Sequence, residues 1–194
     1  MNENKRAAFA VCGSFCTLEP SLRQAARLRA MGWELLPVMS FAAARLDTRF
    51  GRAEEWKRRL EALTGNPVRE TLQAVEPLGP QKLADALVIA PCTGTTLARL
   101  AAGLSDTPVT LAAKSLLRVG CPVVVAISTN DGLGASGENI ARLYQRKHLY
   151  FVPYGQDDPA EKPQSLKAEL DLLPATLEAA LAGRQLQPVL RGRM

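Results

Sequence analysis

Three short segments rich in glycine and hydroxyl side chains each follow a run of apolar residues. The segments are CGSFCT (12–17), PCTGTT (91–96) and STNDGLG (128–134), and the runs are AAFAV (7–11), ALVIA (86–90) and PVVVAI (122–127). A glycine lets the backbone approach a ligand closely, and a hydroxyl adds a hydrogen-bond donor. A helix that begins at such a segment also presents unpaired N–H groups and the positive end of its dipole. Together these features suit the binding of phosphate.

The apolar runs place the three segments in space. Each run is continuous rather than alternating, which is typical of strands buried on both faces of a parallel sheet. In an open parallel sheet all the carboxyl ends lie at one edge, and ligands bind in the crevice there. We therefore expect the three segments to converge around one phosphate-bearing ligand. Each segment taken alone could equally be a simple helix cap, and that alternative stays open.

The cofactor-binding candidates come from these segments and from the end of a weaker strand. They are Gly13, Ser14, Ser40, Thr93, Gly94, Thr95, Ser128, Thr129 and Asn130. We expect Ser14, Thr93 and Thr95 to hold phosphate. We expect the two glycines to allow close approach, and residues 128–130 to face a ring. The phosphate loop G-x-x-x-x-G-K-[ST] and the dinucleotide fingerprint G-x-G-x-x-G are both absent, which favours a mononucleotide.

No complete acid–base machinery can be recognised in the sequence, so the catalytic candidates are few. Arg49 in DTRFG (47–51) could clamp a carboxylate or phosphate bidentately, or could pair with Glu54 or Glu55 at a helix start. Asn130 could donate its amide to a ring carbonyl, or could simply serve a turn, and Asp131 is the third candidate.

The remaining polar candidates have structural interpretations. His148, the single histidine, is expected to be structural or exposed. The pair Asp157–Asp158 precedes Pro159 and is expected to form a turn.

Composition excludes several classes of protein. The chain has 194 residues, of which 47% are hydrophobic and 5% aromatic, so we expect one domain with an aliphatic core. The net charge of +5 is dispersed, without basic runs interleaved with aromatics, which argues against nucleic acid. The apolar runs are too short to span a membrane, and no signal peptide is recognised, so a cytoplasmic location is expected. Four cysteines and one histidine predict neither a disulfide framework nor a metal site.

Helical patterns lie between the apolar runs. We expect one helix after a cap at Thr17, others over 52–63 and 96–104, one starting near 106–109, and one over 137–146 capped by Ser136. Two more are expected over 166–173 and 175–181, after a polar loop at 154–164. The runs at 33–39 and 149–152 are weaker strands, and Pro37 puts the first near an edge.

This alternation predicts an α/β fold. We expect a three-layer Rossmann-like or flavodoxin-like parallel sheet with helices on both faces. The expected domain spans 1–194 and includes a loop-rich, helical extension from about residue 153.

The segments also resemble those of a known superfamily. A strand followed by GS, then APCTGTTLARLAAGL and AISTNDGLGASGENIARL, is similar to the FMN-binding flavoproteins of the cysteine-decarboxylase type. The positions that match its motifs are Pro91, Thr93, Thr96, Asn130, Asn139, Ile140 and Leu143. Thr95 stands where the motif has asparagine, and the first helix has no histidine to act as the decarboxylases' catalytic residue. These departures count against decarboxylation, while the resemblance implies FMN as cofactor.

A resemblance over nearly the whole chain is more specific. DTRFG, EPLGP, APCTG, STNDGLG, PYGQDDP and DLLP occur in the order found in the family of dipicolinate synthase B subunits. This resemblance implies a part in oxidising dihydrodipicolinate, a small dicarboxylate, to dipicolinate during sporulation. It also implies a separate partner, the dehydrogenase-like A subunit of dipicolinate synthase, through which NADP could act. It further implies a place in the mother-cell cytoplasm of a spore-forming bacterium.

The resemblance leaves the role of this chain open. The superfamily implies a homo-oligomer, because its sites often lie between subunits. A non-catalytic protein that stabilises or positions the A subunit is one alternative, and an FMN-dependent decarboxylase is another. Whether Arg49 serves its own site or that of a neighbouring copy is also open.

Overall fold

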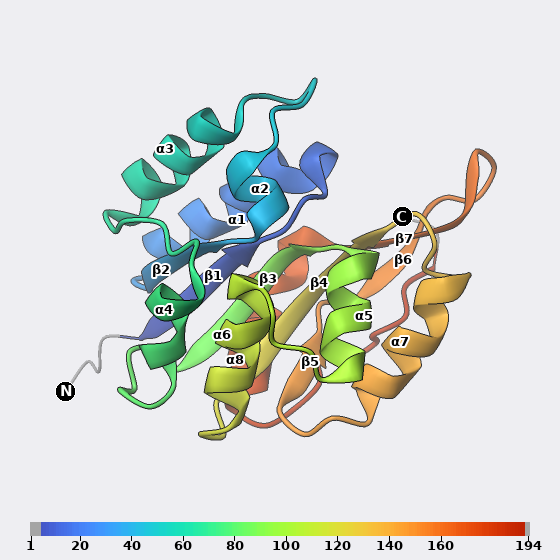
Figure 1. Ribbon diagram of the computed structural model, residues 1–194. Coiled ribbons are helices and arrows are strands. Elements are labelled where there is room, and N and C mark those ends of the chain that lie inside the picture. Colours follow the sequence, from blue (N-terminus) through green and yellow to red (C-terminus); the bar gives the residue numbers. More distant parts are fainter. Residues whose placement is uncertain (1–4, 193–194) are drawn as a thin grey trace.

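A mixed seven-stranded sheet forms the centre of the computed structural model, which describes residues 5–192 (Figure 1). The strands are β1 (Arg6–Val11), β2 (Glu34–Met39), β3 (Ala86–Cys92), β4 (Val123–Thr129), β5 (Leu149–Phe151), β6 (Tyr154–Asp158) and β7 (Lys162–Ala168). The first five pair in parallel in the order β2-β1-β3-β4-β5, which is the flavodoxin-like order. The expected α/β class is confirmed.

The helices occupy the connections between the strands. The α-helices are α1 (Leu18–Ala30), α2 (Phe41–Arg45), α3 (Ala53–Thr64), α4 (Leu72–Val75), α5 (Gly94–Ala102), α6 (Pro108–Leu117), α7 (Ala135–Tyr144) and α8 (Leu173–Leu181). Three short 3-10 turns are η1 (Phe15–Thr17), η2 (Glu76–Leu78) and η3 (Leu170–Leu172). In Figure 1, α4, α5, α6 and α7 lie in front of the sheet and α8 lies behind it, where it contacts α1. The sheet therefore has helices on both faces.

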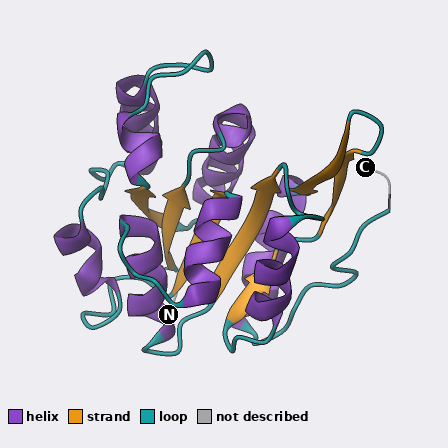
Figure 2. Cartoon of the chain, turned by 45° about the vertical axis from the view of Figure 1, so that its right-hand side comes forward, coloured by secondary structure: helices purple, strands orange, loops and turns teal. Residues whose placement is uncertain are grey.

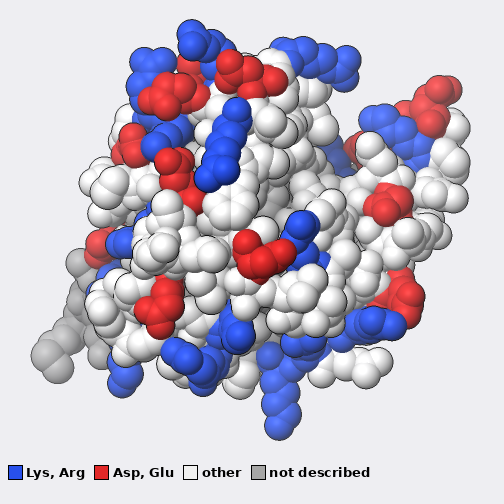
Figure 3. Space-filling model, viewed as in Figure 1, with Lys and Arg blue, Asp and Glu red and all other residues white. Residues whose placement is uncertain are grey.

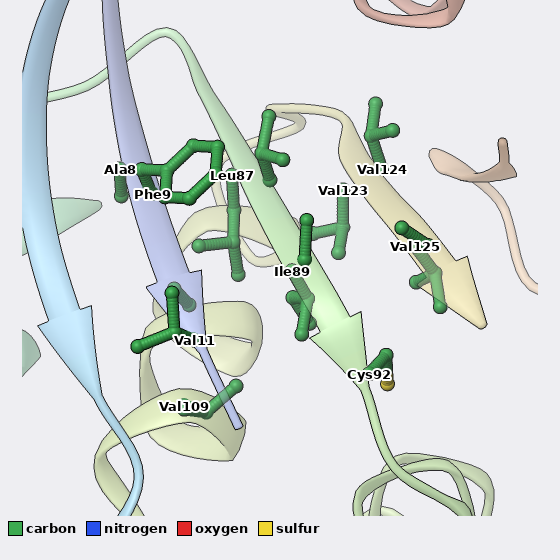
Figure 4. Packing of buried hydrophobic residues seen from close by; sticks show 14 of the residues in the cluster. Ala8, Phe9, Val11, Leu87, Ile89, Cys92, Val109, Val123, Val124 and Val125 are labelled. Carbon is green, nitrogen blue, oxygen red and sulfur yellow. The ribbon is translucent and has the colours of Figure 1, made fainter. Parts of the chain in front are cut away.

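The aliphatic core lies on the central strands. Every residue of β3 is buried, as are residues 7–11 of β1 and 123–127 of β4. Figure 4 shows side chains from these three strands lying together, among them Phe9, Ile89 and Val125. Burial on both faces explains why these strands appear in the sequence as continuous apolar runs.

The edge strand follows the prediction drawn from proline. β2 pairs only with β1 among the named strands, and Pro37 lies inside it. Proline has no N–H to donate to a neighbouring strand, so it is tolerated on an edge strand, where the missing hydrogen bond does not interrupt the sheet. The outer side of β2 is partly covered by residue 69, whose N–H and C=O bond to Pro37 and Met39.

The C-terminal quarter differs from expectation. Residues 154–164, predicted as a loop, and 166–173, predicted as a helix, instead contain an antiparallel hairpin of β6 and β7 (Figure 2). β7 continues the sheet by pairing antiparallel with the carboxyl end of β4. The helix prediction failed because residues 166–173 have leucines at helical spacing, whereas pairing with Ser128 and Thr129 fixes the strand.

Two further findings concern the described part of the chain. Within residues 5–192, no helix is both long and apolar enough to cross a bilayer. In the same range, no three His, Cys, Asp or Glu side chains gather as a metal ion would require.

Candidate functional site

A cavity of about 850 Å³ opens at the carboxyl edge of the parallel strands. Its lining includes Gly13, Ser14 and Thr17 after β1, Thr93, Gly94 and Thr95 after β3, and residues 128–131 at the end of β4. The segments predicted to converge therefore do meet in space. The switch in strand order between β1 and β3 places the cavity where doubly wound sheets bind their ligands.

Three hydroxyl groups, two from the segment after β1 and one from the end of β4, form a compact cluster in this cavity. The Ser14 and Thr17 Oγ atoms are 2.6 Å apart, and each lies 2.8 Å from Ser128 Oγ. We call these residues the hydroxyl triangle. Thr17 was expected only as a helix cap, but its side chain makes no cap bond to α1. Its hydroxyl instead links the segment after β1 to the end of β4.

The segment after β3 presents the start of α5. Thr93 is the N-cap of this nine-residue helix, and its Oγ1 accepts a hydrogen bond from the Thr96 N–H at 3.3 Å. The first N–H groups of α5 have no helical carbonyl partner, and Thr95 is exposed beside them. Thr93 therefore both caps α5 and lines the cavity, so the two interpretations of this segment are compatible.

Asp131 organises the β4 loop. Its Oδ1 accepts hydrogen bonds from Thr129 Oγ1 and, at 2.8 Å, from Ser136 Oγ. The Thr129 hydrogen bond is the main cause that lowers the pKa of Asp131, so this carboxylate stays ionised at neutral pH. Ser136 was expected to cap α7, whose N-cap is Gly134; it lies within the first turn of α7 and serves Asp131 instead.

Gly94 packs directly against this organised loop. A Cβ at position 94 would lie 2.6 Å from Ser136 Oγ, 2.7 Å from Thr129 Oγ1 and 2.9 Å from Asp131 Oδ1. Glycine is therefore required here for the approach of two loops, besides any approach by a ligand.

Arg49 lies at the exposed rim of the cavity. Its guanidinium carbon is 4.8 Å from the centre of the Phe50 ring. Asp47, from the same segment, accepts a hydrogen bond at 2.9 Å from the N–H of Ala53, the first residue of α3, and its Oδ2 lies 3.9 Å from Arg52 Nε. Within residues 5–192, Arg49 makes no ion pair, and the alternative pairing with Glu54 or Glu55 is not observed.

The hairpin contributes a wall that the sequence did not indicate. Asp157, Lys162, Ser165, Leu166 and Lys167 line the cavity from β6 and β7. Because 154–164 was predicted as a loop and 166–173 as a helix, the sequence did not place these residues at the site. The lysines of KPQSLKA (162–168) are the one signal that could have indicated it. The turn predicted for the pair Asp157–Asp158 involves Asp158 alone, whose Oδ1 accepts from the N–H groups of Ala160 and Glu161. The Asp157 carboxylate instead pairs with Lys162 and Lys167.

Two candidate residues have other positions. Ser40 is not among the lining residues; its hydroxyl caps α2 by accepting from the Ala43 N–H at 3.2 Å. His148 is exposed before β5, away from the lining, and its carbonyl accepts from the Val123 N–H. Asn130 is exposed at the cavity edge.

The four cysteines are free, and their environments differ. Cys12 and Cys92 are buried at strand ends, and burial raises the pKa of Cys12 to about 11 and that of Cys92 well above its ordinary value. Burial also raises the pKa of the partly buried Cys121. Cys16 is exposed and lines the cavity.

Comparison with known proteins decides the family. A sequence model of the flavoprotein family matches residues 1–148. The chain belongs to the flavoprotein family. It is 45% identical over 188 residues to the B subunit of dipicolinate synthase from Bacillus subtilis strain 168, covering 97% of this chain and 94% of that protein.

Solved structures with the same fold include dipicolinate synthase B and an FMN-dependent enzyme. The crystal structure of the dipicolinate synthase B subunit from Bacillus halodurans C superposes with a TM-score of 0.89 at 43% identity, covering 98% of this chain and 97% of that one. The FMN-dependent cysteine decarboxylase SpaF gives a TM-score of 0.67 at 25% identity, covering 92% and 97%. The expected resemblance to dipicolinate synthase B subunits is confirmed.

Proposed function

We propose that this chain binds FMN in the 850 Å³ cavity and takes part, in the manner of dipicolinate synthase B subunits, in oxidising dihydrodipicolinate to dipicolinate. The observation that carries the proposal is the meeting of three glycine- and hydroxyl-rich loops at the carboxyl edge of the sheet. The match to the flavoprotein family and the FMN dependence stated for SpaF support the choice of FMN.

The residues present fit a flavin mononucleotide. The hydroxyl triangle and the start of α5 offer uncharged donors and a positive helix end, which suit a phosphate. Ser128, Thr129 and Asn130 extend the same wall for the ring. When bound, FMN supplies an acceptor for two electrons; the chain's own residues bind, orient and exclude water.

The substrate proposed for this site is a small dicarboxylate. Removing two hydrogens from a dihydropyridine ring makes it aromatic, so the driving force lies in the substrate. The protein has to hold the ring in one orientation. Arg49 has an exposed planar guanidinium at the rim, without an ion pair among residues 5–192, which suits bidentate binding of one carboxylate.

The wider setting is proposed from the relatives. The related Bacillus protein is named as one subunit of a synthase, which supports a partner here, the dehydrogenase-like A subunit, and we propose that NADP acts through that partner. We further propose a homo-oligomer in the mother-cell cytoplasm of a spore-forming bacterium. Whether the site is completed by a neighbouring copy is part of this proposal.

The test is a titration of the purified chain with FMN and with riboflavin, followed by flavin fluorescence. FMN should bind at least tenfold more tightly, because riboflavin lacks the phosphate. Ser14→Asp puts a negative charge in the hydroxyl triangle and should abolish FMN binding. Ser105→Asp, outside the cavity, is the matched control and should bind normally. Equal binding of both flavins, or undisturbed binding by Ser14→Asp, would contradict the proposal.

One observation favours a non-catalytic role as the second candidate. None of the described lining residues is a histidine, and the Asp131 carboxylate is held ionised by its hydrogen bonds. A protein that only positions the A subunit needs no acid or base of its own. A purified chain that binds no flavin and yet raises the activity of the A subunit would establish this alternative.

A further inference from the structure

The cavity wall has two regions with different chemistry. The hydroxyl triangle and the first turn of α5 offer an anion neutral hydrogen-bonding groups, and neither contains a cationic side chain. Yet three cationic side chains, Arg49, Lys162 and Lys167, line the same cavity beside the carboxylates of Asp131 and Asp157. The cations therefore mark a second region that suits another anion.

The two lysines belong to one cluster on the hairpin. Lys162 Nζ lies 3.4 Å from Asp157 Oδ2, and Lys167 Nζ lies 3.4 Å from Asp157 Oδ1. We call these three residues the hairpin cluster. Both distances exceed the 2.7–2.9 Å of a tight charged hydrogen bond, so the ion pairs are loose. One carboxylate is shared by two ammonium groups, which leaves positive charge available.

Strand register fixes Lys167 next to the hydroxyl triangle. In the antiparallel ladder of β4 and β7, Lys167 pairs with Ser128, and on the other side of β7 it pairs with Gly155. Directly paired residues in such a ladder project on the same face. Lys167 and Ser128 therefore face the cavity together, and Gly155 adds no side chain that would cover the lysine.

The hairpin and the segment that carries Arg49 lie on opposite sides of the cavity. In Figures 1 and 2, the connection between α2 and α3 and the β6–β7 hairpin both rise beyond the ends of the central strands, with a gap between them. The space-filling view in Figure 3 is hollowed between these parts, and basic side chains occur on both sides of the hollow. The residues that line the cavity come from both.

We propose that the hairpin cluster is the receptor for one carboxylate of a dicarboxylate ligand, while Arg49 receives the other. This inference rests on the proposed function, because the dicarboxylate is the substrate class proposed for the cavity. The incoming carboxylate replaces Asp157 on Lys167. Asp157 holds the lysines in place while the site is empty and competes with the ligand. Lys167 is thus a specificity residue for a second carboxylate.

The test compares ligands with one and two carboxylates. Pyridine-2,6-dicarboxylate and pyridine-2-carboxylate are titrated calorimetrically into the full-length chain in excess FMN, and the FMN affinity is measured separately. The unaltered chain should bind the dicarboxylate about tenfold or more tightly than the monocarboxylate. With FMN kept saturating, Lys167→Gln should remove this preference. Lys147→Gln, an exposed lysine outside the cavity, should keep the preference.

Asp157→Asn is an independent test, because it changes dicarboxylate affinity in the opposite direction from Lys167→Gln. Loss of the competing carboxylate should strengthen dicarboxylate binding and steepen its dependence on salt. A purely structural role for Asp157 would weaken binding instead and would overturn the competition. Thermal unfolding of each variant shows whether the hairpin remains folded; if Lys167→Gln unfolds, Lys162→Gln, on the exposed hairpin tip, takes its place.

The outcomes separate this inference from the proposed function. A dicarboxylate preference that survives Lys167→Gln and Lys162→Gln would overturn the role of the cluster. So would a loss of FMN affinity in Lys167→Gln, since it would assign the lysine to the phosphate. If FMN does not bind but the preference exists and depends on Lys167, the cofactor proposal fails and the hairpin receptor stands.

Discussion

At the scale of single residues, side-chain type predicted which residues line the cavity, but it did not predict which residues they form hydrogen bonds with. The hydroxyls at positions 14, 93, 95, 128 and 129 do line it. The bonds of Ser14 and Thr17 to Ser128 join residues more than 100 positions apart, so no local pattern contained them. Ser40 has a similar sequence setting, but its hydroxyl caps a helix instead.

Arg49→Lys tests the carboxylate clamp at this scale. The substitution keeps the charge and loses the planar fork, so dicarboxylate affinity should fall about tenfold in calorimetry. Arg45→Lys is a matched control, because Arg45 lies over Phe41 at 4.7 Å much as Arg49 lies over Phe50, but outside the cavity. Unaltered affinity in Arg49→Lys would remove this residue from the site.

At the scale of elements, the parallel βα units could be predicted and the hairpin could not. Buried parallel strands are long apolar runs, whereas β7 exposes its first three residues and buries the next two. β7 is held as a strand by its pairing with β4 and β6 and not by its own sequence pattern. Gly132 shows this dependence, since a Cβ there would lie 2.5 Å from the Leu166 side chain on β7.

Gly94→Ala tests how closely the β3 and β4 loops must pack. The new methyl group would collide with Ser136, Thr129 and Asp131, so the free energy of unfolding should fall by about 1–3 kcal/mol in urea titrations. FMN binding should weaken as well, because both loops line the cavity. Gly192→Ala meets no atom within 4 Å and should change neither quantity. Full stability in Gly94→Ala would show that the loops can separate freely.

At the scale of the whole molecule, the sheet buries thiols that must stay neutral. Cys12 is fully buried at the end of β1, accepts a hydrogen bond from Thr96 Oγ1 at 3.4 Å, and has its pKa raised by burial from 9.0 to about 11. An unfolded thiol loses its proton at lower pH than the folded one. The stability due to the neutral thiol is therefore complete below pH 9 and is lost as pH rises toward 11.

The raised pKa of Cys12 predicts that the stability of the unaltered protein and that of Cys12→Ala depend differently on pH. Between pH 9 and 11 the free energy of unfolding should fall more steeply in the unaltered protein than in Cys12→Ala, by up to about 3 kcal/mol. Urea unfolding at several pH values measures both slopes, and their difference cancels the other groups that titrate. Parallel slopes would mean that Cys12 is not sealed in the core.

The proposed FMN site is formed by segments that follow several strands of the sheet. A crystal structure of the chain soaked with FMN would test binding there directly. We predict phosphate density within hydrogen-bond distance of Ser14 and the first N–H groups of α5, with the ring beside residues 128–130. A phosphate bound elsewhere on the molecule, or a cavity still filled by water at saturating FMN, would contradict the proposed function.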